Sequence, residues 1–158
     1  MVVSAVENLI AVIGCGNPNR TDDGVGPYVA GLLGKRDLGG NVAVFDAGTD
    51  GMGVMYQARG CRKLIIVDAR MPGSNPGSIY EVPGEVLESP PNNSLNLHDF
   101  RWDHALFAGR KIYGDDFPSD VTVLLVEAKS LDMGLALSPE VEAAGKRVAA
   151  RIESLCRE

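Results

Sequence analysis

Two neighbouring aspartates, Asp22 and Asp23, lie at the end of a polar loop that begins at Gly14. A short apolar run precedes the loop, and a run with helical spacing follows it. One of the two carboxylates can cap that helix, because aspartate accepts hydrogen bonds from the free N–H groups of a first helical turn. The second carboxylate is then free to bind a ligand, and this surplus acid is the strongest indication of a functional site.

Two other acids end apolar runs farther along the chain. Asp46 follows residues 42–45, and Asp68 follows residues 64–67. Short apolar runs of this kind are typical of strands buried in a parallel sheet, and such sheets bind ligands beyond the carboxyl ends of their strands. The sequence therefore predicts that the Asp22-Asp23 loop, Asp46 and Asp68 gather at one edge of a sheet.

Alternating strands and helices position these acids. The expected strands are residues 9–13, 42–45, 64–68, 78–82 and 121–126. The expected helices are residues 25–33, 52–59, 97–109 and a final helix that starts at Ser138-Pro139, while residues 83–96 are expected to be irregular. This alternation predicts an α/β fold with a mainly parallel sheet covered on both faces, and the length suits a single domain over residues 1–158.

Four familiar kinds of site are poorly supported. Gly14 and Gly16 follow a strand as in dinucleotide-binding proteins, but Asn19 stands where that motif has its third glycine. The chain has no Walker-type Gly-Lys-Ser/Thr sequence and no Gly-x-Ser-x-Gly nucleophile elbow. Cys15 could pair with His98 as a thiol nucleophile, but packing of a small residue at the end of a strand is the favoured interpretation.

A metal site is the alternative that the acids support. The chain has only two histidines, His98 and His104, and six residues of helix would place them roughly 120° apart, so they are not expected to share one ion. Asp23, Asp68 and one histidine would form a nitrogen-and-oxygen ligand set suited to a borderline divalent ion. Structural roles stay open beside this one, with Asp23 as a helix cap and Asp68 as a turn residue that bonds nearby backbone amides.

The composition restricts partners and compartment. The 15 basic and 21 acidic residues give a net charge of −6, which argues against nucleic acid or an anionic membrane as the main partner. Three widely spaced cysteines without a Cys-x-x-Cys pair indicate unpaired thiols in a reducing compartment. No signal peptide and no apolar run near the ~20 residues of a membrane span are found, so we expect a cytoplasmic protein.

Four sequence fragments, taken in order, resemble the hydrogenase maturation proteases. They are Gly14-x-Gly16-Asn17 followed by Asp22-Asp23-Gly24-x-Gly26, then Asp46-x-Gly48-Thr49-x-Gly51, then Leu64-Ile65-Ile66-Val67-Asp68-Ala69, and then Leu137-Ser138-Pro139-Glu140-Val141. The first two match the opening motif and second loop of that family, the third its central strand with the acid, and the fourth the entry to its last helix. The resemblance spans most of the chain.

The resemblance implies a fold, a reaction and a site. The fold is a three-layer α/β/α sandwich with a five-stranded sheet. The reaction is an endopeptidase cleavage that removes the C-terminal extension of a nickel-iron hydrogenase large-subunit precursor after nickel insertion, by an enzyme expected to be a monomer. Two acids and a histidine contact nickel supplied by the precursor, and by motif position these metal-contacting and catalytic residues fall on Asp23, Asp68 and His98. His98 is preferred to His104 because it precedes the body of the expected helix.

Two other functions stay open on the same residues. One is a non-catalytic, metal-dependent module that escorts the precursor, and the other is a protease on the same scaffold whose substrate carries no nickel. The sequence departs from the family at Ala128, where proline is frequent. The stretch 99–116, which includes Trp102, is rich in charged and aromatic residues and is expected to shape recognition of one particular hydrogenase.

Overall fold

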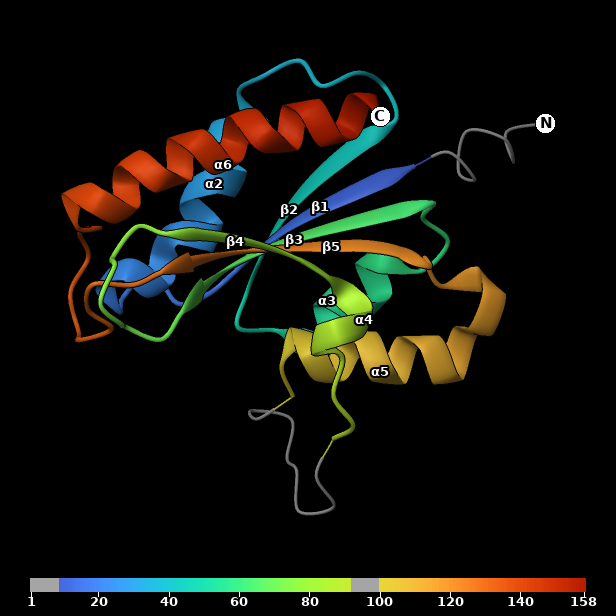
Figure 1. Ribbon diagram of the computed structural model, residues 1–158. Coiled ribbons are helices and arrows are strands. Elements are labelled where there is room, and N and C mark those ends of the chain that lie inside the picture. The colour runs from blue at the N-terminus through green and yellow to red at the C-terminus, as the bar shows by residue number, and fades with distance from the viewer. Residues whose placement is uncertain (1–8, 92–99) are drawn as a thin grey trace.

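A five-stranded sheet forms the middle layer of the structure, a computed structural model that describes residues 9–91 and 100–158 (Figure 1). In spatial order its strands are β2 (Val42–Gly48), β1 (Ile10–Cys15), β3 (Lys63–Arg70), β5 (Asp120–Glu127) and β4 (Ile79–Pro83). The first four pair in parallel, and β4 joins the edge antiparallel to β5. The mainly parallel, five-stranded sheet predicted from the sequence is confirmed.

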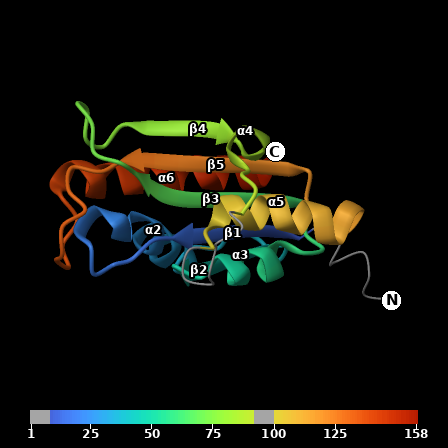
Figure 2. The same cartoon turned by 90° about the horizontal axis from the view of Figure 1, so that it is seen from below.

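Helices cover both faces of this sheet, as Figure 1 and Figure 2 show. On one face lie α2 (Val25–Gly34) and α6 (Pro139–Arg157), and on the other lie α3 (Gly51–Ala58) and α5 (Trp102–Tyr113). Shorter helical segments are η1 (Thr21–Gly24), α4 (Gly84–Leu87) and η3 (Gly114–Asp116). The three-layer α/β/α sandwich is therefore confirmed. Within the described residues, no helix is both long enough and apolar enough to cross a membrane.

The central strands β1 and β3 have uninterrupted apolar sequences because helices bury them on both sides. Alternate residues of β1 point to opposite faces of the sheet. Ile10 and Val12 belong to the core under α2 and α6, whereas Ala11 and Ile13 belong to the core under α3 and α5. Both strands are thus anchored on two sides, and the loops that follow their carboxyl ends start from a rigid base.

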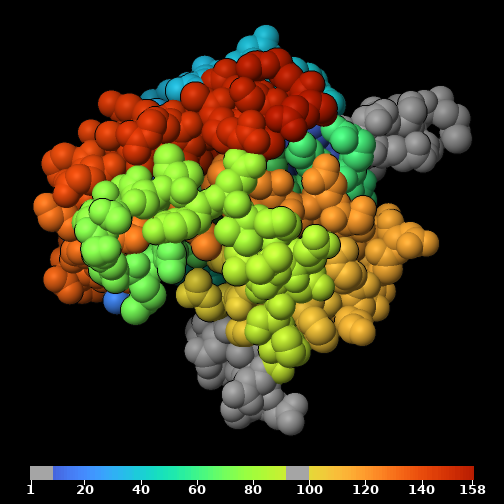
Figure 3. All heavy atoms as spheres, viewed as in Figure 1, coloured from blue at the N-terminus to red at the C-terminus, as the bar shows by residue number. Residues whose placement is uncertain are grey.

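Two predictions about the second half of the chain need correction. The stretch 83–96 was expected to be irregular, but its described part, residues 83–91, contains α4, and residues 92–96 lie outside the described residues. Figure 3 shows α4 on the surface between α6 and α5. The helix expected over residues 97–109 begins at Trp102 and continues to Tyr113, and residues 97–99 lie outside the described residues. Gly109 does not end it, because Gly109 lies buried against the Phe117 ring, and the helix ends at Gly114, where φ is +55°.

Close packing of α2 on the sheet leads to a first testable prediction. A Cβ at Gly26 would lie 2.1 Å from the carbonyl oxygen of Cys15 and 2.7 Å from that of Val67. We expect Gly26→Ala to lower the free energy of unfolding by about 3 kcal/mol, because backbone atoms of two strands would have to move. Gly31→Ala in the same helix is the matched control, since nothing lies within 4 Å of the added methyl group. This control should gain about 0.5–1 kcal/mol of stability, and urea unfolding that gave the same change for both variants would contradict the packing argument.

Candidate functional site

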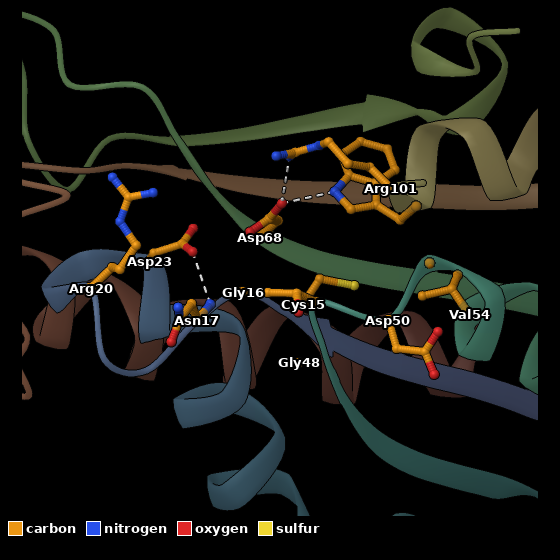
Figure 4. Close-up of a pocket in the computed structure, with 13 residues that line it drawn as sticks. Cys15, Gly16, Asn17, Arg20, Asp23, Gly48, Asp50, Val54, Asp68 and Arg101 are labelled. Atoms are coloured by element: carbon orange, nitrogen blue, oxygen red, sulfur yellow. Dashed lines mark hydrogen bonds and ion pairs between the residues drawn. The ribbon is translucent and has the colours of Figure 1, made fainter. Parts of the chain in front are cut away.

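A cleft of about 380 Å³ opens at the carboxyl ends of β1, β2 and β3 (Figure 4). Its walls come from the loop after β1, the end of β2 with the start of α3, the end of β3, and the start of α5. Asp23 and Asp68 both line it, together with Arg20, Arg101 and Trp102. The sheet edge at which the sequence predicted a site therefore carries a cleft that brings two of the predicted acids together.

Asp68 lies at the bottom of this cleft, where β3 leaves the core, and only 4% of the residue is exposed. Its Oδ2 accepts a hydrogen bond of 2.8 Å from the indole N–H of Trp102 and one of 3.3 Å from the Arg101 guanidinium. Its Oδ1 accepts a hydrogen bond of 2.8 Å from the backbone N–H of Ala69. The start of α5 thus holds a carboxylate that the end of β3 provides.

Burial raises the pKa of the Asp68 carboxyl to about 6. The donors Trp102, Ala69 and Arg101 oppose this rise in pKa, and the negative charge of Asp23 adds to it. At neutral pH Asp68 is ionised, but at a free-energy cost that its donors offset only in part. A positive ligand in the cleft would relieve that cost.

Asp23 approaches Asp68 because the loop after β1 turns at Gly16, where φ is +133°. A Cβ on Gly16 would lie 1.9 Å from the Asp23 carbonyl oxygen and 3.4 Å from Asp68 Oδ1, so only a residue without a side chain fits between the two acids. The Asp23 carboxylate accepts a hydrogen bond of 2.8 Å from the N–H of Asn17, and no other donor reaches it among the described residues. It therefore keeps unused lone pairs at the cleft.

Asp22 does not cap α2, and neither does Asp23, so the prediction that one of them caps the helix is wrong. Both acids lie within the 3₁₀ turn η1, and the N-cap position of α2 is the following residue, Gly24, with no side-chain cap. Asp22 is instead buried and accepts hydrogen bonds from the backbone N–H groups of Lys129, Ser130 and Ser138, at 2.8, 3.2 and 2.7 Å. Asp22 therefore orders the loops around it, because these bonds tie η1 to the loop between β5 and α6.

Ser138 begins the last helix as predicted, but its side chain binds an unexpected partner. It is the N-cap residue of α6, and Pro139 is the first helical residue, as predicted. Its hydroxyl donates to the Asp22 carboxylate rather than capping its own helix. The two motifs that open and close the chain are thus connected through one buried carboxylate.

The histidine of the expected triad is not placed by the structure. His98 lies outside the described residues and stays a prediction. His104 is described and does not line the cleft. Its Nδ1 instead accepts a hydrogen bond of 3.1 Å from the Arg101 N–H at the start of α5. In residues 9–91 and 100–158, no three His, Cys, Asp or Glu side chains form a group that could hold a metal ion. Asp23 and Asp68 are thus the two carboxylate ligands of the expected set that the described cleft provides.

Two other candidates from the sequence have structural roles. Cys15 lines the cleft but is 4% exposed and belongs to the core, and burial, together with the charge of Asp68, raises the pKa of its thiol well above the usual value. A thiol that stays protonated is a poor nucleophile, so the packing interpretation of Cys15 is confirmed. Asp46 does not line the cleft, and its carboxylate accepts a hydrogen bond of 3.0 Å from the Gly48 N–H within the turn after β2.

Sequence reasoning missed three residues of the cleft. Arg20 and Arg101 received no role, and Trp102 was noted only as part of an aromatic stretch. Arg101 and Trp102 are 33 and 34 residues from Asp68 in the sequence, and no spacing rule links a strand end to the start of a later helix at that distance. The one signal that could have identified Arg101 and Trp102 is the expectation that the start of a later helix faces the end of β3.

Comparison with known proteins identifies relatives along most of the chain. The family model for hydrogenase maturation proteases matches residues 27–155, a range that includes Asp68 and His98 and begins after Asp23. The Hydrogenase 2 maturation protease of Escherichia coli is 31% identical over 136 residues, which is 85% of this chain and 82% of the relative.

Solved structures share the fold and lead to the same family. The hydrogenase maturating endopeptidase HybD from Escherichia coli has a TM-score of 0.78 and 27% identity over 94% of this chain and 92% of that one. The [NiFe] hydrogenase maturation protease HycI from Thermococcus kodakarensis, with a TM-score of 0.72 and 18% identity over 96% and 94% of the two chains, shows the fold alone. Since a family model covers most of its length, the chain belongs to the hydrogenase maturation protease family, a family of peptidases.

Proposed function

We propose that this peptidase removes the C-terminal extension of a nickel-iron hydrogenase large-subunit precursor after nickel has been inserted. The observation that carries the proposal is the meeting of Asp23 and Asp68 in one open cleft at the carboxyl edge of the sheet. Family membership and the likeness to hydrogenase maturating endopeptidases support the choice of substrate. The expected partner is therefore the precursor protein, which brings the metal to the cleft as part of the substrate.

The two carboxylates suit different parts of this reaction. Asp68 is buried and held by Trp102, Arg101 and Ala69, so it is a fixed negative charge that faces any positive ligand in the cleft. Asp23 is less buried and keeps free lone pairs, so it can orient the attacking water and accept its proton. Nickel carried by the precursor would polarise the scissile carbonyl group.

His98 completes the expected triad as the third residue in contact with the metal. It lies three positions before Arg101 in the sequence, and Arg101 lines the cleft. The residues that hold Asp68 are thus close neighbours of His98 along the chain. This placement supports, from the sequence side, a histidine that acts with Asp23 and Asp68.

Cleavage assays with and without nickel test the substrate. The purified protein should shorten a nickel-loaded large-subunit precursor and leave the nickel-free precursor intact, because Asp68 gains from a cation in the cleft. Mass spectrometry of the precursor before and after incubation measures the loss of the extension. Equal cleavage of both forms would favour the nickel-independent protease, and binding without any shortened product would favour the escort module.

A further inference from the structure

Arg20 is an exposed arginine on the rim of the cleft. The two arginines that line the cleft extend to the same side of Asp23 and Asp68 in Figure 4. Arg101 is already paired, with Asp68 at 3.3 Å and Asp103 at 3.8 Å. Arg20 is exposed, and across residues 9–91 and 100–158 no carboxylate lies within ion-pair distance of it. The guanidinium of Arg20 is therefore available to a ligand.

One edge of this guanidinium is fixed by the protein. Its Nε–H donates a hydrogen bond of 3.1 Å to the Leu131 carbonyl oxygen, in the loop between β5 and α6. Within the part of the chain that the structure describes, the two terminal nitrogens have no partner, and they form the fork that binds a carboxylate in a bidentate manner. An arginine held in this way loses less conformational freedom on binding than one that is free in solvent.

The backbone beside Arg20 is held in an unusual conformation. Thr21 has a φ of +47°, a left-handed value that is rare for a β-branched residue. The loop between β5 and α6 holds it there: the Thr21 N–H donates to the Gly134 carbonyl at 2.8 Å, and its hydroxyl donates to the Ser130 carbonyl at 2.9 Å. The same loop donates backbone hydrogen bonds to the buried Asp22 carboxylate. These contacts hold the backbone beside Arg20 in one conformation and so limit the directions that its side chain can take.

The chemistry around Arg20 fits a polypeptide better than a small anion. Met133 and Leu135, on either side of Gly134, are 77% and 81% exposed, and Gly134 pairs with Arg20 through the backbone. A segment that carries both a carboxylate and apolar side chains can contact all three residues, whereas an inorganic ion would use only the arginine. The positive charge of Arg20 would also offset the repulsion between such a carboxylate and Asp23, which lies three positions farther along the chain.

We propose that Arg20 is a specificity-determining residue that binds a carboxylate of the substrate polypeptide near the scissile bond, while Met133 and Leu135 contact apolar side chains of the same segment. The inference rests on the proposed function. Two sources of the carboxylate are possible, an acidic side chain of the precursor or the terminal carboxylate of its extension. The same experiment distinguishes them.

Cleavage kinetics of the nickel-loaded precursor test the role of Arg20. We expect Arg20→Gln to raise KM about 10- to 100-fold with kcat within about threefold, and Arg20→Lys to recover part of the loss. Arg36→Gln is the matched control, because Arg36 is an exposed arginine beyond the far end of α2 that pairs with Glu153. Its KM should be unchanged, and thermal melting of each variant shows whether the fold is intact.

Changes in the precursor identify the source of the carboxylate. Each acidic residue near the cleavage site is replaced by its amide, and a second precursor is lengthened by a short glycine-serine tail. The precursor change that removes the partner of Arg20 should raise KM for the unsubstituted enzyme and should leave the KM of Arg20→Gln unchanged. Such non-additive effects are expected of two groups in direct contact. A KM for Arg20→Gln within twofold of the unsubstituted enzyme, or precursor changes that act equally on both enzymes, would overturn the proposal.

The two proposals fail in different ways. If the unsubstituted protein leaves the precursor intact, the proposed function fails. Fluorescence anisotropy then tests Arg20 directly, by measuring the dissociation constant for the same precursor. A rise of about 10-fold or more in that constant for Arg20→Gln would support the contact, and an equal constant or no binding at all would overturn it. If cleavage occurs but Arg20→Gln is normal, only the inference about Arg20 is wrong.

Discussion

Asp23→Asn is expected to slow precursor cleavage by a factor of about 100 or more while leaving the melting temperature within about 2 °C of the unsubstituted protein. The asparagine amide has nearly the size of the carboxylate, and its oxygen can accept the same hydrogen bond from the Asn17 N–H. The loop after β1 therefore keeps its shape. The negative charge and the basic oxygen are lost, and these are what contact with nickel and proton transfer require.

Asp22→Asn should have the opposite pattern, although the two residues are neighbours. An amide NH₂ group would face at least one of the N–H donors of Lys129, Ser130 and Ser138, in a place that water does not reach. We expect a loss of about 3 kcal/mol of stability, which is roughly a 10 °C fall in melting temperature. At a temperature where this variant is folded, it should keep most of its cleavage activity.

Thermal unfolding and cleavage rate, measured on both variants, separate the two roles. The matched pair matters because the substitutions are chemically identical and differ by one position in the chain. Normal processing by Asp23→Asn would show that Asp23 has a structural role alone. An Asp22→Asn variant as stable as the unsubstituted protein would contradict the view that this carboxylate holds the loop between β5 and α6 in place.

Asp68→Asn is expected to stabilise the metal-free protein at neutral pH and to abolish cleavage. The pKa of about 6 in the folded state lies roughly two units above that of an unfolded aspartate, which corresponds to about 3 kcal/mol at pH values above both. The neutral amide avoids the cost of burying a charge, and its oxygen can still accept the hydrogen bond from Trp102. Its NH₂ group then faces the Ala69 N–H and loses that bond, but the protonated carboxyl has the same O–H donor to place, so the charge decides the comparison. A gain in stability with a loss of function is typical of residues that serve a reaction.

The sign of the pH dependence follows from the raised pKa. Below about pH 4 the carboxyl is protonated in the folded and the unfolded state, so the charge costs nothing there. As the pH rises from about 4 to 6, the unfolded chain ionises first, and the stability of the unsubstituted protein falls relative to that of Asp68→Asn. Above about pH 6 the difference is complete and stays constant.

Urea unfolding of both proteins between pH 4 and pH 8 measures this difference. The two stabilities should converge at the acidic end and separate by about 3 kcal/mol at the neutral end. A constant difference at every pH would show that the carboxyl of Asp68 titrates normally. A less stable Asp68→Asn at pH 7.5 would show that the hydrogen bonds to the charged group outweigh the cost of its burial.

The sequence alone predicted the layers of the molecule and the edge that carries the site. Strands buried on both faces need continuous apolar runs, and residues 64–67 of β3 form such a run. A parallel sheet then directs the carboxyl ends of these strands to one side, so Asp23 and Asp68 could be assigned to a common edge although 45 positions separate them. Local signals also placed the start of α6 at Pro139.

Only the tertiary structure decided what each polar side chain does at that edge. Asp22 looked like a helix cap because local rules consider the next turn of the chain, yet its donors lie more than 100 residues away. Arg101 and Trp102 hold Asp68 across two elements that no sequence period connects, and Arg20 is directed by a loop after the last strand. Hydrogen bonds between distant segments depend on how the layers pack, and a linear pattern does not encode that packing. The doubled aspartate was therefore visible in the sequence, and the family resemblance already directed Asp23 to the site, while the distant partners that Asp22 binds came only from the fold.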